Sequence, residues 1–355
     1  MDPAQPHSVC RALMCALAPM GAPWAAAPLE RLPDTGLAHD HVRLVGTGWL
    51  ARVPKQSQMG LAATDNLAYQ AACFERASIT GHAPRLGAVL PPSASLPRGA
   101  LLVEEIVGRP ARLPDDLGAV VHALAALHRL PMPAPAQRPP LLDAFDPLRD
   151  LLAEIEAQVA CADLAGLEEP VRDALDQGLQ RLRAAVAAPQ RPPRQLIAFD
   201  AHPGNFVVRP DDQAVLVDLE KCRYSYAGLD LAHATLYTST TWDVATHAVL
   251  THDQVAEAYR QWADAVGPEL AQSARPWHGL LRQAMALWSL SWCAKWKALS
   301  QRGANGSADG EDWSATHSAD ALVAHVRERV DHYLSAPVVV AMARELQDLQ
   351  HRGSV

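Results

Sequence analysis

Three oxygen-bearing side chains lie close together in one stretch of the chain, LIAFDAHPGNFVVRPDDQAVLVDLEKCRYSYAGLDLAH, residues 196–233. Asp200 and Asn205 lie between two short apolar runs, and Asp218 lies in a third run, thirteen residues after Asn205. Carboxylate and amide oxygens are the ligands that Mg²⁺ and other hard cations prefer in proteins. The stretch therefore predicts an all-oxygen cation site next to buried apolar segments.

The elements that must position these residues are short strands within a helical region. The runs LIAFD, NFVV and AVLVDLE are typical of a hairpin. Helical spacing of apolar residues predicts helices over 115–130, 143–162 and 168–187, and again from about 228 onward with a Gly/Ser/Asp-rich break at 303–312. The Pro-rich stretch 131–142 is interpreted as a loop.

The first hundred residues have a different pattern. Residues 29–53 indicate three antiparallel strands, and 64–77 indicate a helix that Thr64 or Asp65 can cap. The runs RLGAVL and ALLVEEI indicate two more strands. Because the composition changes at Gly108-Arg109-Pro110, we expect an N-terminal extension (1–27), a sheet-rich lobe (28–107) and a helical lobe (108–355).

Length and composition set the broad class. A chain of 355 residues exceeds the usual size of one hydrophobic core, and 49% hydrophobic with 20% charged residues is typical of a globular enzyme. The net charge of -8 argues against a nucleic-acid-binding surface, and no apolar run is long enough to cross a membrane.

The cysteines and the N-terminus bear on location. The six cysteines are far apart and form no Cys-x-x-Cys pair, which favours reduced thiols in a cytoplasmic protein over zinc binding or a disulfide framework. The apolar N-terminal stretch loosely imitates a secretion signal, but it is short and interrupted by prolines. We interpret it as part of a cytoplasmic protein, with secretion as the alternative.

The motif D-A-H-P-G-N, followed by V-D-L-E, resembles the aminoglycoside phosphotransferase and choline kinase family, which typically carries H-G-D-x-H-P-x-N and I-D-x-E/G. The resemblance implies an α+β, bilobal protein-kinase-like fold with a small antiparallel-sheet N-lobe and a larger, mainly helical C-lobe. It also implies a catalytic loop over 196–208 and a metal-binding strand over 214–220.

The resemblance implies roles for the polar residues of the motif. Asp200 would be the base that orients and deprotonates an attacking hydroxyl, while Asn205 and Asp218 would hold Mg²⁺ on the nucleotide phosphates. Glu220 would contact a second metal or the substrate.

For two further residues of the stretch, the expected role is structural support of the catalytic loop. Asp230 in GLDLAH matches the family's D-L-A element, in which the carboxylate braces the catalytic loop. His202 is expected to make a hydrogen bond within the loop instead of binding metal.

The N-lobe has weaker signals for nucleotide binding. The loop 34–41 would cover the phosphates at Gly36, and Arg52 would be the strand cation of the family, with Lys55 as the second choice. The run LLVEEIVG resembles the hinge between the lobes, where backbone groups of Glu104, Glu105 and Ile106 would meet the adenine edge.

Two departures from the family pattern affect activity. Ala198-Phe199 stands where the family usually has His-Gly, and Gln70 stands where a Glu partner of the strand cation is expected. A Gln can hydrogen-bond Arg52 but supplies no charge. These departures keep one alternative open, a catalytically weak, nucleotide-binding pseudokinase acting through a partner. A second alternative is a Mg²⁺-dependent hydrolase that uses the same carboxylates on water, but the spacing from Asp200 to Asn205 and the hinge-like strand favour transfer.

The acceptor site is expected among the C-terminal helices. Trp288, Trp292 and Trp296 are spaced four residues apart and could stack on a cationic amine, a sugar or a nucleoside, and Asp243 could favour an amine. The alternative is that the three indoles are core residues. The sequence thus predicts an ATP- and Mg²⁺-dependent small-molecule kinase that phosphorylates a hydroxyl of a polar metabolite or antibiotic, including one that bears an amine.

Overall fold

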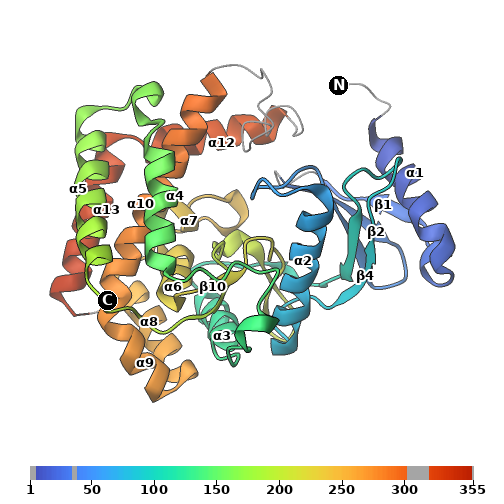
Figure 1. Cartoon of the computed structure of the whole chain (residues 1–355), viewed down its shortest axis with the longest axis horizontal. Helices are drawn as coiled ribbons and strands as arrows, with labels where there is room; N and C mark the ends of the chain where they lie inside the picture. The colour runs from blue at the N-terminus through green and yellow to red at the C-terminus, as the bar shows by residue number, and fades with distance from the viewer. Residues whose placement is uncertain (1–4, 34–37, 302–319, 354–355) are drawn as a thin grey trace. The chain divides into compact units, whose positions relative to one another are not determined.

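The structure is a computed structural model that describes residues 5–33, 38–301 and 320–353. The chain divides into two compact units, one built mainly from residues up to Val107 and the other beginning at Gly108. The first unit contains an antiparallel sheet, and the second is mainly helical (Figure 1). The predicted α+β class, with a small antiparallel sheet and a larger helical part, is confirmed.

The first unit is built on a five-stranded sheet with the order β1-β2-β3-β5-β4. All neighbouring strands are antiparallel. The strands are β1 (Leu29–Arg31), β2 (His39–Leu44), β3 (Trp49–Pro54), β4 (Leu86–Leu90) and β5 (Ala100–Glu104). The predicted meander over 29–53 is confirmed. The predicted loop over 34–41 is wrong at its end, because β2 already begins at His39. Gly36 lies outside the described residues.

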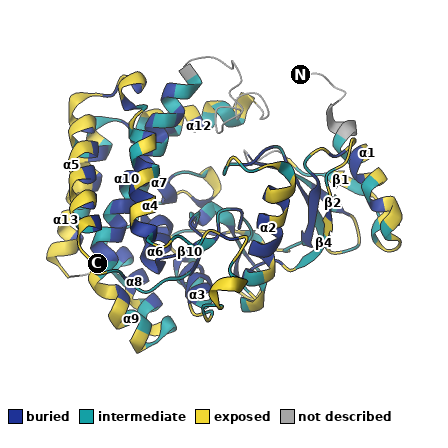
Figure 2. Ribbon diagram, in the orientation of Figure 1, coloured by how far each residue is buried: buried dark blue, intermediate teal, exposed yellow. Residues whose placement is uncertain are grey.

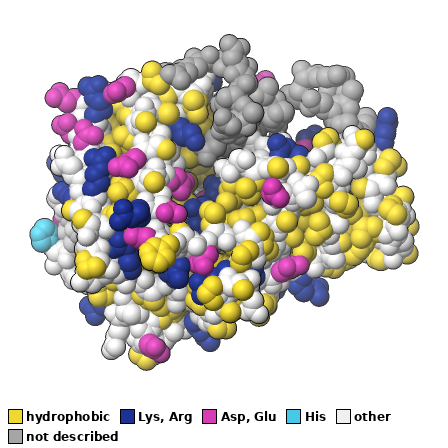
Figure 3. Space-filling view, in the orientation of Figure 1, with side chains coloured by type: hydrophobic (Ala, Val, Ile, Leu, Met, Phe, Trp, Pro, Cys, Tyr) yellow, Lys and Arg dark blue, Asp and Glu magenta, His cyan; other side chains and the backbone are white. Residues whose placement is uncertain are grey.

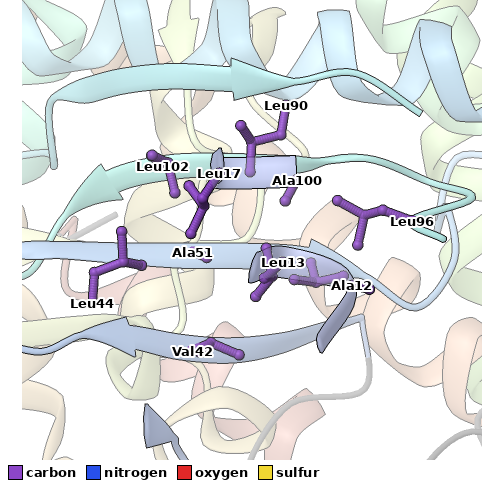
Figure 4. Close-up of a cluster of buried hydrophobic side chains, with 11 residues drawn as sticks. Ala12, Leu13, Leu17, Val42, Leu44, Ala51, Leu90, Leu96, Ala100 and Leu102 are labelled. Atoms are coloured by element: carbon purple, nitrogen blue, oxygen red, sulfur yellow. The ribbon is translucent and has the colours of Figure 1, made fainter. Parts of the chain in front are cut away.

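Side-chain alternation gives this sheet two apolar faces. On one face, Ala12, Leu13 and Leu17 of helix α1 (Gln5–Leu17) pack against residues of the sheet such as Val42 and Ala51 (Figure 4). This helix was not predicted from the sequence. Residues 1–27 were predicted only as an N-terminal extension, and their apolar stretch was considered only as a possible secretion signal.

The other face of the sheet packs on helix α2 (Ala63–Ala77), and Figure 1 shows α1 and α2 on opposite sides of the strands. The predicted helix is confirmed, but the predicted cap is wrong. The N-cap is Ala62, which uses no side chain, so Thr64 and Asp65 lie inside the first turn. Asp65 still contributes there, because a carboxylate near a helix N-terminus interacts favourably with the helix dipole.

The second unit is assembled around the long helix α10. This helix (His278–Gln301) packs on α4, α5, α6 and α13. The helices after the sheet are α3 (Leu117–His128), α4 (Pro147–Val159), α5 (Glu169–Ala187), α6 (Ala227–Thr235), α7 (Tyr237–Thr240), α8 (His252–Val266), α9 (Pro268–Ala274), α10, α12 (Asp320–Tyr333) and α13 (Ala336–His351). The three helices predicted before residue 190 are confirmed, with ends shifted by up to four residues.

Short strands interrupt this helical unit near the motif that contains Asp200, Asn205 and Asp218. Strand β8 (Phe206–Val208) pairs with β9 (Ala214–Leu216) as the predicted hairpin, and β6 (Arg109–Pro110) adds to its edge. Strand β7 (Gln195–Ile197) instead pairs with β10 (Arg223–Ser225), a strand that the sequence analysis did not expect. The predicted strand 214–220 is too long, because β9 ends at Leu216 and Asp218 and Glu220 follow it.

The surface of the helical unit is polar and mixed in charge. Helices α5 and α13 have many exposed residues along their length (Figure 2). Acidic and basic side chains are interspersed on the face seen in Figure 3. Among the described residues, no helix is long and apolar enough to cross a membrane. The cytoplasmic location stays a prediction.

A buried carboxylate fixes the backbone just before Asp200. The Oδ2 atom of Asp230 accepts a hydrogen bond from the Ala198 N–H at 2.7 Å, and its Oδ1 atom accepts from the Phe199 N–H at 2.8 Å. Asp230 is fully buried, so neither backbone donor has water as a substitute partner.

His128 orients this carboxylate from another helix. Its Nδ1 atom accepts from the indole N–H of Trp262 at 2.9 Å, and an indole N–H can only donate. The proton of a neutral His128 is therefore on Nε2, which donates to Asp230 Oδ2 at 3.0 Å. The chain Trp262–His128–Asp230 thus ties helices α8, α3 and α6 to the segment that carries Asp200.

The segment is also strained. Phe199 has a φ of 62°, in the left-handed region that favours glycine. Its amide is held by Asp230, and its carbonyl oxygen lies 3.2 Å from Nδ1 of His233. The aromatic residue occupies this conformation because the surroundings hold both sides of its backbone.

We expect Asp230→Asn to destabilise the protein by about 1–3 kcal/mol, because one amide NH₂ would face a buried donor and leave it unsatisfied. Urea denaturation measures this, with Asp253→Asn as the matched control, since the Asp253 side chain is 92% exposed. Equal stability of the two variants would contradict the bracing role of Asp230.

At position 199 we expect Phe199→Gly to be more stable than Phe199→Ala by about 1 kcal/mol. Both variants lose the ring, but only glycine relieves the positive φ. Phe206, buried with a φ of -112°, is the matched control site, where alanine should be the more stable replacement. The strain at Phe199 is refuted if alanine exceeds glycine at both sites in urea denaturation.

Candidate active site

Asp200 follows strand β7 and makes an ion pair. Its Oδ2 atom lies 2.9 Å from Nζ of Lys221, and the two side chains are only 19% and 13% exposed. Burial alone would raise the pKa of Asp200, but several electrostatic interactions, of which the charge of Lys221 is the largest, together outweigh it and hold this pKa well below the usual carboxyl range. Asp200 is therefore ionised at neutral pH.

His233 stands on the other side of the Asp200 carboxylate. Its Nδ1 atom lies 3.8 Å from Asp200 Oδ1 and is closer to the carbonyl oxygen of Phe199. Because a carbonyl only accepts, Nδ1 carries the proton of the neutral ring. Burial lowers the pKa of His233 to about 4, against the opposing charge of Asp200. His233 is thus neutral near pH 7, and Lys221 is the cation beside Asp200.

The turn between Asp200 and Asn205 is held by its own side chains. Pro203–Asn205 form a 3₁₀ helix whose N-cap is His202, and His202 Nδ1 accepts from the Gly204 N–H at 3.1 Å. The Nδ2 atom of Asn205 donates to the Asp200 carbonyl at 2.9 Å. This bond points the amide nitrogen of Asn205 toward the Asp200 backbone. The Oδ1 atom is then the side-chain atom of Asn205 that can bind a cation.

Asn205 and Asp218 come from adjacent backbone positions. The Val217 N–H donates to the Asn205 carbonyl at 2.9 Å. Asp218 is the next residue in the chain, so its backbone lies close to that of Asn205. Glu220 follows two residues later and is 5% exposed. An amide oxygen and two carboxylates form a donor set that suits a hard divalent cation, so the chemistry of these residues fits Mg²⁺.

Charged and aromatic side chains near Asp200 form a second layer. Lys221 Nζ lies 5.8 Å from the Trp288 ring, and Trp288 donates from Nε1 to Glu154 Oε1 at 2.8 Å. The guanidinium carbon of Arg223 lies 3.6 Å from the centroid of the Phe199 ring. Cation–π contacts of this kind fix the position of a cation and a ring together. Lys221 was not among the predicted site residues, although it directly follows the V-D-L-E motif in a chain with four lysines.

The three tryptophans of α10 have different surroundings. Trp288 meets the Phe199 ring at 5.3 Å, near Asp200, and Trp296 is 4% exposed in the interior. Trp292 is half-buried and meets Trp242 at 5.8 Å, edge to face. Four-residue spacing turns each indole about 40° from the previous one. The structure therefore does not bring the three predicted residues to one surface.

Asp243 lies next to the turn that contains His202 and Asn205. A Cβ atom on Gly204 would be 3.1 Å from Asp243 Oδ2, so the glycine permits this close approach. The other oxygen, Oδ1, caps a short 3₁₀ helix (Val244–Thr246) by accepting from the Ala245 N–H at 2.7 Å.

In the first unit, Arg52 and Gln70 do not meet as a simple pair. Arg52 Nη2 lies 3.3 Å from His39 Nδ1, and Gln70 Oε1 lies 2.9 Å from His39 Nε2. Lys55 lies one residue beyond β3, and its backbone N–H donates to the Ala38 carbonyl at 2.8 Å. The imidazole of His39 thus stands between the predicted strand cation and the glutamine that replaces the expected Glu.

The predicted hinge residues lie at the end of β5. The Glu104 N–H donates to the Arg85 carbonyl and the Glu105 N–H donates to the Gly48 carbonyl, each at 2.9 Å. The Glu105 side chain pairs with Arg43 at 2.6 Å. Two of the three amide groups considered for adenine are therefore engaged in the sheet, which leaves carbonyl oxygens and the Ile106 backbone for that role.

Solved structures with the same fold include several kinases. A choline/ethanolamine kinase family protein from Mesorhizobium loti is 18% identical, with a TM-score of 0.60 over 96% of this chain and 98% of that chain. Choline kinase from Cryptosporidium parvum is 12% identical, with a TM-score of 0.56 over 99% and 98%. The GDP complex of aminoglycoside 2'-phosphotransferase-IIIa is 15% identical, with a TM-score of 0.56 over 93% and 99%.

These similarities confirm the predicted bilobal protein-kinase-like fold. No curated protein sequence is significantly similar to the chain. The model of the phosphotransferase enzyme family, however, matches residues 19–277, which include the sheet of the first unit and the whole motif around Asp200. The predicted enzyme class is confirmed, and the chain belongs to the phosphotransferase enzyme family.

Proposed function

We propose that this protein is an ATP- and Mg²⁺-dependent small-molecule kinase that transfers the γ-phosphoryl group to a hydroxyl of a polar metabolite or antibiotic. The observation that carries the proposal is the ionised Asp200 carboxylate, held by Lys221 in a loop that also bears Asn205 and is followed by Asp218. In phosphoryl transfer, catalysis consists mainly of positioning and charge neutralisation, which such a cluster can provide.

Asp200 would act on the acceptor hydroxyl. Its low pKa makes it a weak base in the resting protein, so its first contribution is to orient the hydroxyl by accepting its hydrogen bond. As the hydroxyl oxygen bonds to the γ-phosphorus, the bond from that phosphorus to the β–γ bridging oxygen would break and the nucleoside diphosphate would leave. The hydroxyl becomes more acidic in this step, and its proton would pass to Asp200 Oδ1 or Oδ2. Lys221 would meanwhile offset negative charge close to the reacting oxygen.

Asn205 and Asp218 would hold Mg²⁺ through their side-chain oxygens, and Glu220 would bind a second metal or the substrate. The bound ion would neutralise charge on the nucleotide phosphates. His202 and Asp230 would support this arrangement only indirectly, because both engage backbone N–H groups of the loop.

In the first unit, Arg52 would contact the nucleotide phosphates and the backbone at Glu104, Glu105 and Ile106 would contact the base. The burial of Arg52, 4% exposed within the sheet, supports a fixed cation of this kind. Gly36 stays a prediction for the phosphate loop. One solved relative is a GDP complex, so the nucleotide assay should include GTP beside ATP.

The acceptor would lie near Trp288 and Asp243, which are the two predicted pocket residues next to the Asp200 loop. An indole and a carboxylate together favour a cationic amine. The half-buried Trp292 could extend the pocket, whereas the interior position of Trp296 favours a core role.

We expect Asp200→Asn to lower kcat by about 10²–10⁴ with little change in nucleotide affinity. The measurement is Mg²⁺-dependent ATP and GTP consumption with a panel of hydroxylated amines, aminoglycosides, nucleosides and sugars. Asp211→Asn, at an exposed turn of the neighbouring hairpin, is the control. Full turnover by Asp200→Asn would contradict the proposed base, and nucleotide binding without turnover by the unmodified protein would favour the pseudokinase alternative.

For the metal, we expect Asp218→Ala to raise the nucleotide Kd measured with Mg²⁺ to the value measured without it. The reason is that a lost carboxylate removes the ligand that links the cation to the protein. Isothermal titration with and without Mg²⁺ checks this, and Asp176→Ala on the exposed face of α5 is the control. A Mg²⁺-dependent gain in affinity that survives in Asp218→Ala would show that this residue does not bind the metal.

A further inference from the structure

His233 of α6 uses one ring nitrogen for a bond to the backbone, and its other nitrogen has no such bond. Its Nδ1 atom lies 3.2 Å from the Phe199 carbonyl oxygen and 3.8 Å from Asp200 Oδ1. The residue is only 7% exposed, and its Nε2 atom has no hydrogen-bond partner among the residues that the structure describes. Nε2 of His278, also a described residue, is enclosed without a partner, whereas Nε2 of His233 is not enclosed. Since polar atoms of buried side chains are normally hydrogen-bonded, this nitrogen is a contact point for a bound molecule.

The unbonded nitrogen of His233 is a hydrogen-bond acceptor. The proton of the ring is on Nδ1, because the Phe199 carbonyl can only accept. Burial lowers the pKa of His233 to about 4, although the charge of Asp200 acts in the opposite direction. The ring is therefore neutral at pH 7, and the lone pair of Nε2 is available to a donor.

His202 carries the complementary group. Its Nδ1 atom accepts from the Gly204 N–H at 3.1 Å, so the proton of the His202 ring is on Nε2, which can only donate. The rings of His202 and His233 are centred 6.2 Å apart, and these two residues form no direct hydrogen bond. One oxygen atom can bridge two nitrogens at such a separation, because each hydrogen bond is about 2.9 Å long. A hydroxyl can accept from one ring and donate to the other, whereas an ammonium can only donate.

The two imidazoles lie beside the oxygen of Asp200 that Lys221 does not bind. Lys221 is bonded to Oδ2, and Oδ1 is the oxygen closer to His233. His202 follows Asp200 by two residues in the same turn. The Trp288 ring is centred 6.3 Å from the His233 ring and adds an apolar surface beside the polar atoms. A carboxylate oxygen, a ring acceptor, a ring donor and an indole thus lie close together.

We propose that His233 and His202 bind a second hydroxyl of the acceptor, on the carbon next to the phosphorylated hydroxyl, so that the preferred acceptor is a vicinal diol. The second hydroxyl donates to Nε2 of His233 and accepts from Nε2 of His202. This inference rests on the proposed function, in which Asp200 orients the hydroxyl that is phosphorylated. Two neighbouring hydroxyls held in this way fix the direction of the acceptor as well as its position. An amine on a more distant carbon, near Asp243, is compatible with this arrangement.

Two substitutions separate the two bonds of the His233 ring. In His233→Asn, the amide nitrogen can keep the bond to the Phe199 carbonyl, because it takes the position of Nδ1, but no acceptor remains at the position of Nε2. In His233→Gln, the amide oxygen can take the position of Nε2, but the donor to Phe199 is lost. His202→Asn is the matched change in the other ring, because its oxygen can still accept from the Gly204 N–H while the outer donor is removed.

The experiment measures kcat/KM of the full-length protein with Mg²⁺-ATP and three acceptors that differ only at the neighbouring carbon. The first set is glycerol, 1,3-propanediol and 2-amino-1,3-propanediol, and the second is the most active acceptor of the panel above with its deoxy and amino analogues. We expect the unmodified protein to prefer the diol at least about tenfold, the equivalent of two neutral hydrogen bonds. His233→Asn and His202→Asn should each reduce this preference to about threefold, with the nucleotide KM unchanged, and the double variant should remove it.

Thermal denaturation separates recognition from folding. We expect His233→Gln to lower the melting temperature and keep the preference for the diol, and His233→Asn to show the reverse. Equal use of the diol and its deoxy analogue by the unmodified protein overturns the proposal, and so does a preference that survives in His233→Asn. A higher kcat/KM for the amino analogue overturns the assignment of a hydroxyl.

If His233→Asn does not fold, His202→Asn decides, and an unchanged preference in that variant refutes the site. The two levels of the argument also fail differently. If the unmodified protein phosphorylates no acceptor of either set, the proposed function fails and this inference falls with it. If the protein phosphorylates acceptors without a preference for the diol, only the role of the two histidines fails.

Discussion

The arrangement around Asp200 depends on one buried carboxylate. Asp230 accepts hydrogen bonds from two consecutive backbone N–H groups, at Ala198 and Phe199, and so fixes the direction in which the chain enters Asp200. Its bond to the Phe199 N–H also helps to offset the positive φ of Phe199, a conformation that costs about 1–3 kcal/mol for a residue other than glycine. His128 and Trp262 then fix the carboxylate itself, from helices that also share a hydrophobic core. The position of the Asp200 side chain therefore depends on how helices α3, α6 and α8 pack.

The charges near Asp200 follow a second constraint, the cost of burying an ion without a partner. Lys221 supplies the partner, and His233 stays neutral because its own burial lowers its pKa more than Asp200 raises it. The site therefore holds one close ion pair instead of a carboxylate between two cations. Within this pair, the charge of Lys221 offsets the charge of Asp200.

The sequence could predict the parts of this structure that are local. The spacing of apolar residues predicted the helices at residues 117–128, 147–159 and 169–187. The motif pointed to Asp200, Asn205 and Asp218 as candidate site residues. The sequence could not predict partners that are distant in the chain. His128 is 102 residues from Asp230, and Trp262 is 134 residues from His128, so no spacing rule connects them. The pairing of β7 with β10 was missed for the same reason, since three-residue strands carry too little pattern to specify a partner.

The two departures from the family pattern show how a fold can absorb the loss of a familiar residue. At Phe199, the missing glycine is compensated by bonds to both sides of the backbone, and Arg223 stacks 3.6 Å from the ring that glycine would not have. At Gln70, the missing carboxylate is replaced by an amide that reaches Arg52 through His39. In each unit the residue contacts a neighbour that the motif does not include: Phe199 contacts Arg223, and Gln70 contacts His39. A change in a motif residue therefore has to be judged together with its contacts, because without Asp230 the buried backbone N–H groups of Ala198 and Phe199 would lose their acceptor.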